Sequence, residues 1–352
     1  MQKHYDYEIM SENKVIAKWE NNELIVFNQA LLPLYLKRVS NADMWLATRA
    51  VDSHRAHSRL LKKALRLSEK DDVSTVMRAN GATITDTYWI RPIGSELKYE
   101  DVSFSYDYIS MRIANIALNG SYSAFNYVAS KPSPNVAELT NVGSFEKCWK
   151  MIDGKWWLYK QANQRERFSE VFIYRLCKEL DINAAVYEAG DNYIKSLDFT
   201  DGAKVNFEPA ISFMGENEDY FDVIDRLNEL CKGAVPDYIK MLFIDTITAN
   251  PDRHTGNFGL LRNKNTGKIL GLAPCFDHNM ALISRGYPGN PKASDLLITL
   301  LNDVLEKYPK YKKYIPNLTR EIVLKVIKDV NMKVKSDVVA DMIMSRYSMI
   351  KK

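Results

Sequence analysis

The chain has 352 residues, of which 46% are hydrophobic and 26% charged, so its composition is that of an ordinary folded protein and argues against disorder. The length suits one large bilobal domain or two ordinary domains. A formal charge of +4 is too small to indicate a nucleic-acid-binding protein by itself, and no apolar run approaches the length of a membrane span.

The cysteines are scattered along the chain and form no CxxC pair: Cys148, Cys177, Cys231 and Cys275. This spacing argues against a zinc site and fits a reducing compartment. The first ten residues carry charges and lack the apolar core of a signal peptide. We therefore expect a cytoplasmic protein without a secretory signal.

The N-terminal third predicts a small sheet and a basic helix. Residues 15–17, 24–27 and 31–36 alternate like short strands, and Asn21-Asn22 supplies a turn between the first two. Residues 52–67 predict a helix whose apolar stripe lies opposite a basic face formed by Arg55, Arg59, Lys62, Lys63 and Arg66. That face is either a solvated surface or a dock for an acidic partner or nucleic acid.

An extended segment ends at Arg91-Pro92 and is followed by an aromatic-rich stretch. After that stretch the sequence predicts a hairpin. Gly143 and Ser144 allow the backbone to approach phosphate groups closely. One strand runs to Met151, Asp153-Gly154 makes the turn, and the second strand ends at Lys160. A lysine in that position can reach the α- and β-phosphates of a nucleotide.

The next segments predict a helix over 163–180 and a strand over 193–197. Glu170 lies ten residues after Lys160 and is a candidate partner for that lysine, with Glu166 as the alternative. The strand leads into the segment from Ser196 through Leu197 to Phe199. Its place in the order fits a hinge between two lobes, where main-chain groups bind adenine.

The most informative stretch begins with a helix that starts near Pro236-Asp237 and ends at Asn250-Pro251, since proline disfavours the α conformation of the residue before it. A polar loop, DRHTGN, follows over 252–257. A hairpin with the strands FGLLR and KILGL then leads to Cys275-Phe276-Asp277-His278. Both acidic loops can emerge on one side of this unit.

Phosphoryl transfer requires a carboxylate that orients the attacking hydroxyl, and an amide oxygen and a second carboxylate that hold magnesium on the triphosphate. Asp252, Asn257 and Asp277 fit these three roles, with Asn257 and Asp277 as the metal ligands. Asp252 and Asn257 have the spacing of a protein-kinase catalytic loop, although His278 and Asn279 stand where an Asp-Phe-Gly triplet has phenylalanine and glycine. His254 either touches the γ-phosphate or braces the loop.

These residues resemble the HipA-like serine/threonine kinases of bacteria, which carry an Asp-x-His-x-x-Asn loop and a later aspartate. The Asp-Arg-His-x-x-Asn form is also similar to the phosphatidylinositol 3- and 4-kinases, which are related in fold. The resemblance covers roughly residues 130–350 at the level of motifs.

The resemblance implies an α+β, bilobal kinase-like fold with a helical C-terminal lobe, and ATP and Mg²⁺ as cofactors. It implies a protein substrate, an antitoxin or DNA-binding partner protein, and autophosphorylation in the phosphate loop. Thr140 occupies the position of the modified serine, and Ser144 is the competing residue. The loop GYPGNP at 286–291 lies where an activation or substrate segment belongs, and helices are predicted over 294–308, 320–330 and 335–347.

We expect residues 1–130 and 131–198 to form the N-terminal lobe, with the nucleotide-binding core in the second range, and residues 199–352 to form the catalytic lobe. A HipA-like protein kinase is the preferred function. One alternative is a lipid or small-molecule kinase, suggested by the Asp-Arg-His-x-x-Asn form. The other is a non-catalytic nucleotide-binding regulator that holds nucleic acid or protein.

Overall fold

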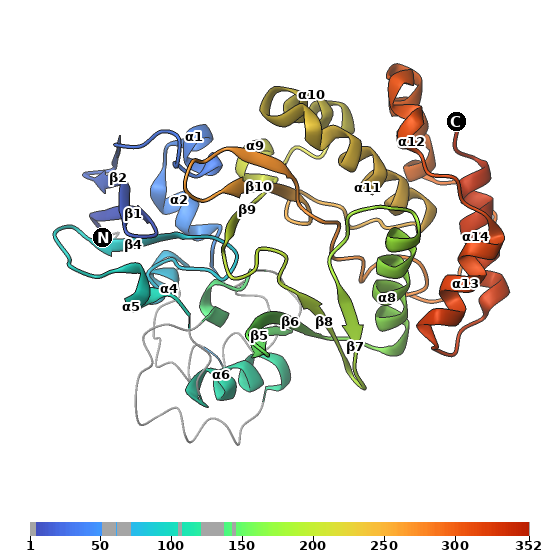
Figure 1. Ribbon diagram of the computed structural model, residues 1–352, viewed down its shortest axis with the longest axis horizontal. Coiled ribbons are helices and arrows are strands. Elements are labelled where there is room, and N and C mark those ends of the chain that lie inside the picture. Colours follow the sequence, from blue (N-terminus) through green and yellow to red (C-terminus); the bar gives the residue numbers. More distant parts are fainter. Residues whose placement is uncertain are drawn as a thin grey trace. The chain divides into compact units, whose positions relative to one another are not determined.

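The computed structural model describes residues 5–50, 61, 72–104, 108–120, 137–142 and 146–351 (Figure 1). The chain divides into two compact units. Unit 1 comprises Met1–Gln161, Thr200–Glu208 and Arg262–Lys268, and unit 2 comprises Ala162–Phe199, Pro209–Leu261 and Ile269–Lys352. The lobe boundaries predicted at 130/131 and 198/199 stay a prediction. The predicted basic helix over 52–67 lies outside the described residues, apart from Leu61.

Unit 1 contains an antiparallel sheet with the strand order β3-β2-β1-β4. Its strands are β1 (Tyr7–Ser11), β2 (Lys14–Glu20), β3 (Glu23–Val26) and β4 (Tyr88–Pro92). Asn21 and Asn22 connect β2 to β3 with φ values of 52° and 64°, which asparagine tolerates in a hairpin turn. The turn and the two strands around it therefore form as predicted.

The strand predicted over residues 31–36 is wrong, because Leu34–Val39 form helix α1. Leu34, Tyr35 and Leu36 are all buried, so the side chains do not alternate between two faces. Pro33 stands at the N-cap, where its fixed φ and missing N–H cost the helix nothing. The first free N–H of the helix, that of Leu34, donates to Oε2 of Glu208 over 3.0 Å.

The remaining elements of unit 1 are short helices and a hairpin: α2 (Ala42–Ala47), α4 (Asp72–Met77), α5 (Tyr99–Val102), α6 (Tyr108–Asn119), the 3₁₀ helix η1 (Ala137–Thr140), β5 (Lys147–Ile152) and β6 (Lys155–Gln161). β5 and β6 pair antiparallel with Lys147 opposite Lys160. Asp153 and Gly154 form the connecting turn with φ values of 50° and 74°. This is the predicted hairpin.

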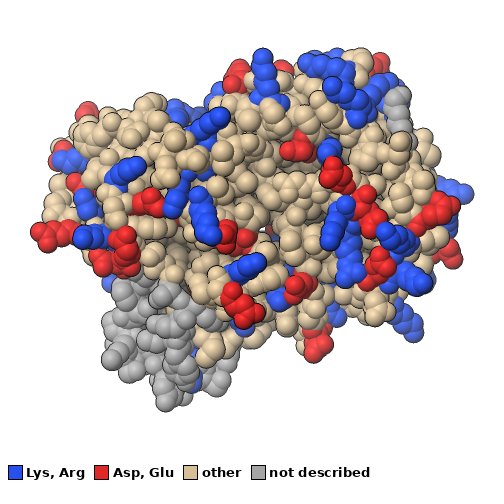
Figure 2. Space-filling model, viewed as in Figure 1, with Lys and Arg blue, Asp and Glu red and all other residues tan. Residues whose placement is uncertain are grey.

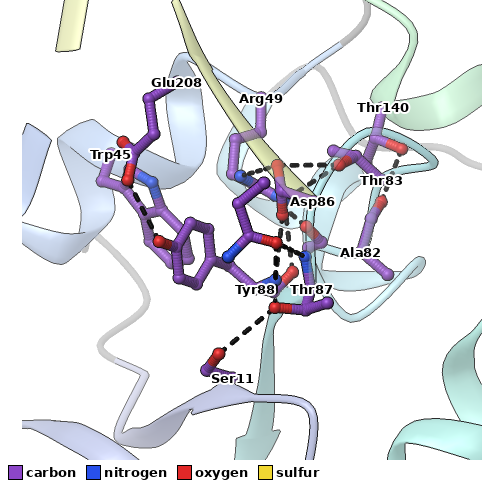
Figure 3. Close-up of polar contacts among 12 residues, drawn as sticks. Ser11, Trp45, Arg49, Ala82, Thr83, Asp86, Thr87, Tyr88, Thr140 and Glu208 are labelled. Atoms are coloured by element: carbon purple, nitrogen blue, oxygen red, sulfur yellow. Dashed lines mark hydrogen bonds and ion pairs between the residues drawn. The ribbon is translucent and has the colours of Figure 1, made fainter. Parts of the chain in front are cut away.

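Buried polar contacts fix the loops of unit 1 against β4 (Figure 3). Arg49 makes a two-pronged ion pair with Asp86, at 3.0 Å from Nη1 to Oδ2 and 2.9 Å from Nη2 to Oδ1. The backbone N–H of Thr87 donates to Oδ1 of Asn206 over 2.9 Å, and the Oη of Tyr88 donates to Glu208 over 3.0 Å. Since each of these groups is buried and bonded, the segment around residue 86 has one conformation.

Unit 2 is mostly helical. Its helices are α8 (Gln164–Glu179), α9 (Ile211–Met214), α10 (Tyr220–Cys231), η2 (Lys232–Ala234), α11 (Val235–Ile247), α12 (Leu296–Lys307), η3 (Pro309–Tyr314), α13 (Arg320–Val330) and α14 (Ser336–Ser348). β7 (Tyr187–Ala189) and β8 (Tyr193–Leu197) pair antiparallel. β9 (Val205–Pro209) and β10 (Gly259–Asn263) contain residues of both units, and β11 (Ile269–Leu272) belongs to unit 2. The predicted helices over 320–330 and 335–347 are confirmed as α13 and α14.

Helix α11 is the buried centre of unit 2. Apolar side chains cover most of its surface, so it follows the pattern of a helix packed on all sides. Pro236 lies in its first turn, and Ala249 beyond its end adopts a left-handed φ of 49°. Asp245, 1% exposed, is a buried charge on this mostly apolar helix. Such a charge needs a partner, and the loop after the helix supplies it.

No described helix combines the length and apolar character that crossing a bilayer requires. On the face shown in Figure 2, basic and acidic side chains are interspersed, in keeping with the small net charge.

Candidate functional site

The polar loop at 252–257 is fastened to the end of α11 through Asp245. Nδ2 of Asn250 donates to Oδ1 of Asp245 over 2.7 Å, and the N–H of Asn250 donates to the main-chain oxygen of Asp245 over 2.9 Å. The N–H of Asp252 in turn donates to Oδ1 of Asn250 over 3.3 Å. Asn250 is fully buried and bonds to both Asp245 and Asp252, so it fixes the backbone of Asp252 relative to helix α11.

Arg253 connects this loop to both α11 and the segment around Asp277. Its Nε lies 2.8 Å from Oδ2 of Asp245 and its Nη2 lies 3.0 Å from Oδ1. Nη1 donates to the main-chain oxygens of Asn257 and of Phe276, the latter over 2.8 Å. Burial disfavours the charge, but the Asp245 carboxylate raises the pKa of Arg253 above its ordinary value. The guanidinium is therefore a permanent cationic link.

Asp252 and Asn257 are held in a fixed relation by the loop itself. Nδ2 of Asn257 donates to the main-chain oxygen of Asp252 over 2.8 Å. Because that amide nitrogen must face a carbonyl, the oxygen Oδ1 of Asn257 is the atom left for a metal ion. Asn257 is 6% exposed and Asp252 is half-buried, so the carboxylate has access to solvent while its backbone is fixed.

His254 braces the loop through one ring nitrogen. Its Nδ1 accepts the N–H of Gly256 over 3.0 Å, so a neutral ring carries its proton on Nε2. The residue is exposed, which leaves Nε2–H accessible for an incoming group. A Cβ at position 256 would lie 2.8 Å from Cε1 of His254, so a larger residue there would displace the ring from this position.

Asp277 adopts a left-handed backbone conformation with φ at 59°. Aspartate is among the few residues that tolerate this region. Its N–H donates to Oη of Tyr187 over 2.8 Å, and Tyr187 is buried at the start of β7. The bond to Tyr187 therefore fixes Asp277 in a backbone conformation that few residue types adopt.

Glu170 contacts the same segment from helix α8. Its Oε2 accepts the N–H of His278 over 3.0 Å, and its side chain is fully buried. Glu166 has a different place, because its carboxylate accepts the N–H of Asn163 over 2.7 Å in the capping box of α8. Of the two glutamates considered from the sequence, Glu170 is therefore the one brought to the Asp277 segment.

His278, at the position where the Asp-Phe-Gly triplet has phenylalanine, lies against Arg253. Its Nε2 is 3.0 Å from Nη2 of Arg253. A guanidinium only donates, so Nε2 is the acceptor and the ring is neutral with its proton on Nδ1. The buried imidazole thus adds a link between the 252–257 loop and the Asp277 segment, which phenylalanine could not make.

No protein-family model matches the sequence, and no curated protein matches it. The solved structure of the Shewanella oneidensis MR-1 toxin–antitoxin system HipA, with HipB and operator DNA, aligns over 98% of this chain and 96% of its own, at 13% identity and a TM-score of 0.59. The chain has a HipA-like kinase fold.

A second solved structure, the Helicobacter pylori proinflammatory kinase CtkA, aligns over 58% of this chain and 90% of its own. Its 17% identity and TM-score of 0.42 are too low to support an argument about the fold. The HipA-like kinase fold confirms the α+β, kinase-like fold class expected from the sequence.

The predicted hinge of the HipA-like kinase fold lies on and just beyond β8. Ser196 pairs with Tyr187, and the N–H of Leu197 donates to the main-chain oxygen of Val186 over 2.9 Å. The ring of Phe199 lies 5.6 Å from the ring of Phe276. The fold therefore brings the predicted hinge next to the segment that carries Asp277, within unit 2.

The predicted phosphate-contacting residues belong to unit 1. Lys160 is 6% exposed at the end of β6. Gly143 and Ser144 lie outside the described residues. Thr140 is 5% exposed, and its hydroxyl donates to the main-chain oxygen of Ala82 over 2.6 Å (Figure 3). Phosphorylation of Thr140 would require this hydroxyl to leave its buried hydrogen bond.

The donor set in unit 2 fits a magnesium ion that is bound with a nucleotide. No group of three His, Cys, Asp or Glu side chains able to hold a metal by themselves occurs among the described residues. Mg²⁺ is usually held by one or two carboxylates together with substrate phosphates and water. Asn257 and Asp277 carry oxygen atoms of the kind that this mode of binding uses.

Sequence reasoning missed three residues that assemble this site: Asp245, Arg253 and Tyr187. Asp245 could have been noticed as a charged residue within an apolar helical pattern, a position that requires a buried partner. Arg253 lies inside the DRHTGN loop, but the spacing of the motif assigns no role to its side chain. The hydroxyl of Tyr187 has no local signal, because its partner is 90 residues away.

Proposed function

We propose that this protein is an ATP- and Mg²⁺-dependent serine/threonine protein kinase of HipA-like type. One observation carries the proposal: the guanidinium of Arg253 binds the main-chain oxygens of both Asn257 and Phe276. The residue after Phe276 is Asp277, so one cation brings together the two segments that hold the candidate metal ligands and the candidate base.

Asp252 is proposed to orient the attacking hydroxyl and to accept its proton. Its N–H is bound to Asn250 and its main-chain oxygen to Asn257, so the backbone beneath the carboxylate cannot turn. Phosphoryl transfer proceeds through a loose transition state, and the protein acts mainly by placing groups and charges. A half-buried carboxylate on a rigid loop suits this role.

Asn257 and Asp277 are proposed to hold Mg²⁺, which when bound with ATP neutralises charge on the phosphates. Tyr187 and Glu170 fix the main chain at Asp277 and His278 through separate hydrogen bonds. The Nε2–H of His254 is proposed to touch the γ-phosphate while its Nδ1 braces the loop. Both roles considered for this histidine are thereby served by one ring.

Lys160 is proposed to steady the α- and β-phosphates, with Glu170 as its partner and Gly143 and Ser144 in the phosphate loop. The segment from Ser196 through Leu197 to Phe199 is proposed to receive adenine. These assignments rest on the order of the motifs along the chain and on the shared fold. Autophosphorylation at Thr140 or Ser144 remains part of the proposal.

The solved HipA structure contains HipB and operator DNA. We infer that this chain likewise works with an antitoxin or DNA-binding partner protein. Its substrate is proposed to be the hydroxyl group of a serine or threonine in another protein.

The proposal is tested by incubating the purified protein with ATP and Mg²⁺ and measuring intact and peptide mass spectra, with Asp252→Ala as the control. A phosphoryl group on wild type alone, at Thr140 or Ser144, is the expected result. Clear ATP binding without modification of the protein would favour a small-molecule kinase or a regulator. No ATP binding would end the kinase assignment.

A further inference from the structure

Cationic side chains from helix α8 and from the start of α14 lie against one tyrosine of the loop that follows the Asp277 segment. The ring of Tyr287 has the guanidinium of Arg165 at 5.8 Å and the ammonium of Lys335 at 5.2 Å from its centroid. Its hydroxyl accepts the N–H of Lys335 over 2.8 Å. A Cβ added at Gly286 would lie 3.7 Å from Nη1 of Arg165, so Arg165 lies against the loop itself. Arg285, two residues before Tyr287, is exposed.

These cations have no acidic partner among the residues that the structure describes. Arg165, Arg285 and Lys335 form no ion pair there, whereas nearby Arg320 and Lys325 are paired with Asp337 and Asp341 and with Glu179. The closest acid in sequence to Arg165, Glu166, is used by the capping box of α8. A positive charge that the fold leaves uncompensated is available to an anion from outside.

The cluster is tied to the candidate catalytic residues by short connections. Leu282 donates its N–H to the main-chain oxygen of Thr248 over 2.7 Å, which holds the chain after Asp277 against the end of α11. On α8, Arg165 lies five residues before Glu170, which contacts His278. Five helical residues span about 7.5 Å, so Arg165 lies within about two helical turns of the residue that contacts the Asp277 segment.

We propose that Arg165, Arg285 and Lys335 bind acidic side chains of the substrate polypeptide close to the hydroxyl that accepts the phosphoryl group. The inference rests on the proposed kinase function and names its substrate class: a serine or threonine in a segment rich in Asp and Glu. Arg165 and Lys335 on one ring, with the exposed Arg285 two residues before that tyrosine, form a compact site suited to a few carboxylates. A nucleic-acid duplex would instead require a longer basic stripe.

The test measures binding directly, so it does not depend on phosphoryl transfer. Fluorescent serine peptides with glutamates on both sides, and matched peptides with glutamines, are titrated with the full chain by fluorescence anisotropy at low and moderate salt. The variants are Arg165→Gln, Lys335→Gln and the double variant. Lys310→Gln is the matched control, because Lys310 lies on η3 over the ring of Tyr311 at 5.0 Å. This substitution removes the same charge from a tyrosine outside the cluster.

The acidic peptide should bind more tightly than the neutral one, and salt should reduce the difference. Each substitution in the cluster should weaken the acidic peptide about three- to fivefold, as expected for an exposed ion pair, and leave the neutral peptide unchanged. Equal binding of both peptides, or an equal loss in Lys310→Gln, would overturn the proposal. So would binding of duplex DNA that Arg165→Gln weakens while acidic peptide binding is absent.

The two proposals can fail separately. If the acidic peptide binds through the cluster but ATP and Mg²⁺ produce no phosphopeptide, the anion site stands and the kinase function fails. If peptides are phosphorylated at equal rates whatever their charge, the kinase function stands and the substrate preference fails.

Discussion

The carboxylate of Asp245 and the guanidinium of Arg253 form a two-pronged ion pair in the interior of unit 2, with 2.8 Å between Nε and Oδ2 and 3.0 Å between Nη2 and Oδ1. Asp245 belongs to the most buried helix, α11, and Arg253 to the loop that carries Asp252. The side chains are 1% and 3% exposed. The pair therefore adds to the bonds from Asn250 that fix this loop to the end of α11.

Removing one member of this pair should be strongly destabilising. Asp245→Asn leaves the Arg253 cation buried without its counter-charge, and Arg253→Gln does the converse. A buried pair broken on one side costs about 3–5 kcal/mol in the free energy of unfolding. Urea denaturation of both variants measures this cost.

The double variant Asp245→Asn with Arg253→Gln is the control, since it removes both charges of the pair and leaves neither one buried without its partner. It should recover part of the lost stability, yet phosphoryl transfer should remain low because the link to the main-chain oxygen of Phe276 is gone. Near-normal turnover in any Arg253 variant that folds would refute the positioning role of Arg253.

Asp277 offers a test that separates backbone strain from metal binding. Asn tolerates the left-handed conformation at φ 59°, whereas Ala pays about 1–2 kcal/mol there. Asp277→Asn should therefore be the more stable of the two variants on thermal melting. Both should lose phosphoryl transfer and Mg²⁺-dependent ATP binding, because neither supplies a carboxylate. Activity in either variant would remove Asp277 from the proposed site.

Tyr187→Phe removes only the hydroxyl that accepts the N–H of Asp277. The N–H is left without its partner, at a cost of about 1 kcal/mol or somewhat more in stability. We expect weaker Mg²⁺-dependent ATP binding, measured by calorimetry, with the carboxylate of Asp277 still in place. Tyr238→Phe is the matched control, since Tyr238 is also a buried tyrosine of unit 2. An unchanged magnesium dependence in Tyr187→Phe would show that the hydrogen bond has no positioning role.

The pair of Asp295 and Arg346 makes stability depend on acidity. Partial burial raises the pKa of Asp295, but the hydrogen bonds and charge of Arg346 outweigh it and lower the pKa below 3.8. The contribution of this carboxylate to stability is therefore complete above about pH 3.8 and is lost as the pH falls through the lowered value. Asp295→Asn keeps an acceptor for the N-cap of α12 but loses the charge.

Thermal melts of wild type and Asp295→Asn across this range check the prediction. The wild type should be more stable at neutral pH, and the difference between the two proteins should shrink below about pH 3.8. A stability difference that persists at the lowest pH would show that it does not arise from the lowered pKa of Asp295.

Features that depend on local chemistry could be predicted from the residues alone. Helix α13 begins and ends at the predicted residues, Arg320 and Val330, because apolar periodicity and an N-cap threonine are local signals. The turns at Asn21-Asn22 and Asp153-Gly154 follow from residues that tolerate positive φ. The order of the loop at 252–257, the hairpin and Asp277 was likewise readable, since motif and spacing lie within one stretch.

Long-range packing selects which buried groups contact one another. Glu166 and Glu170 are both glutamates near the start of one helix, and packing alone places the second against His278. The alternating pattern at residues 31–36 is compatible with a strand, but burial of three successive side chains and a carboxylate from Glu208 favour helix α1. The partners of Asp277 and Asp245 are set by long-range desolvation, because a buried polar group must find a partner wherever the fold supplies one.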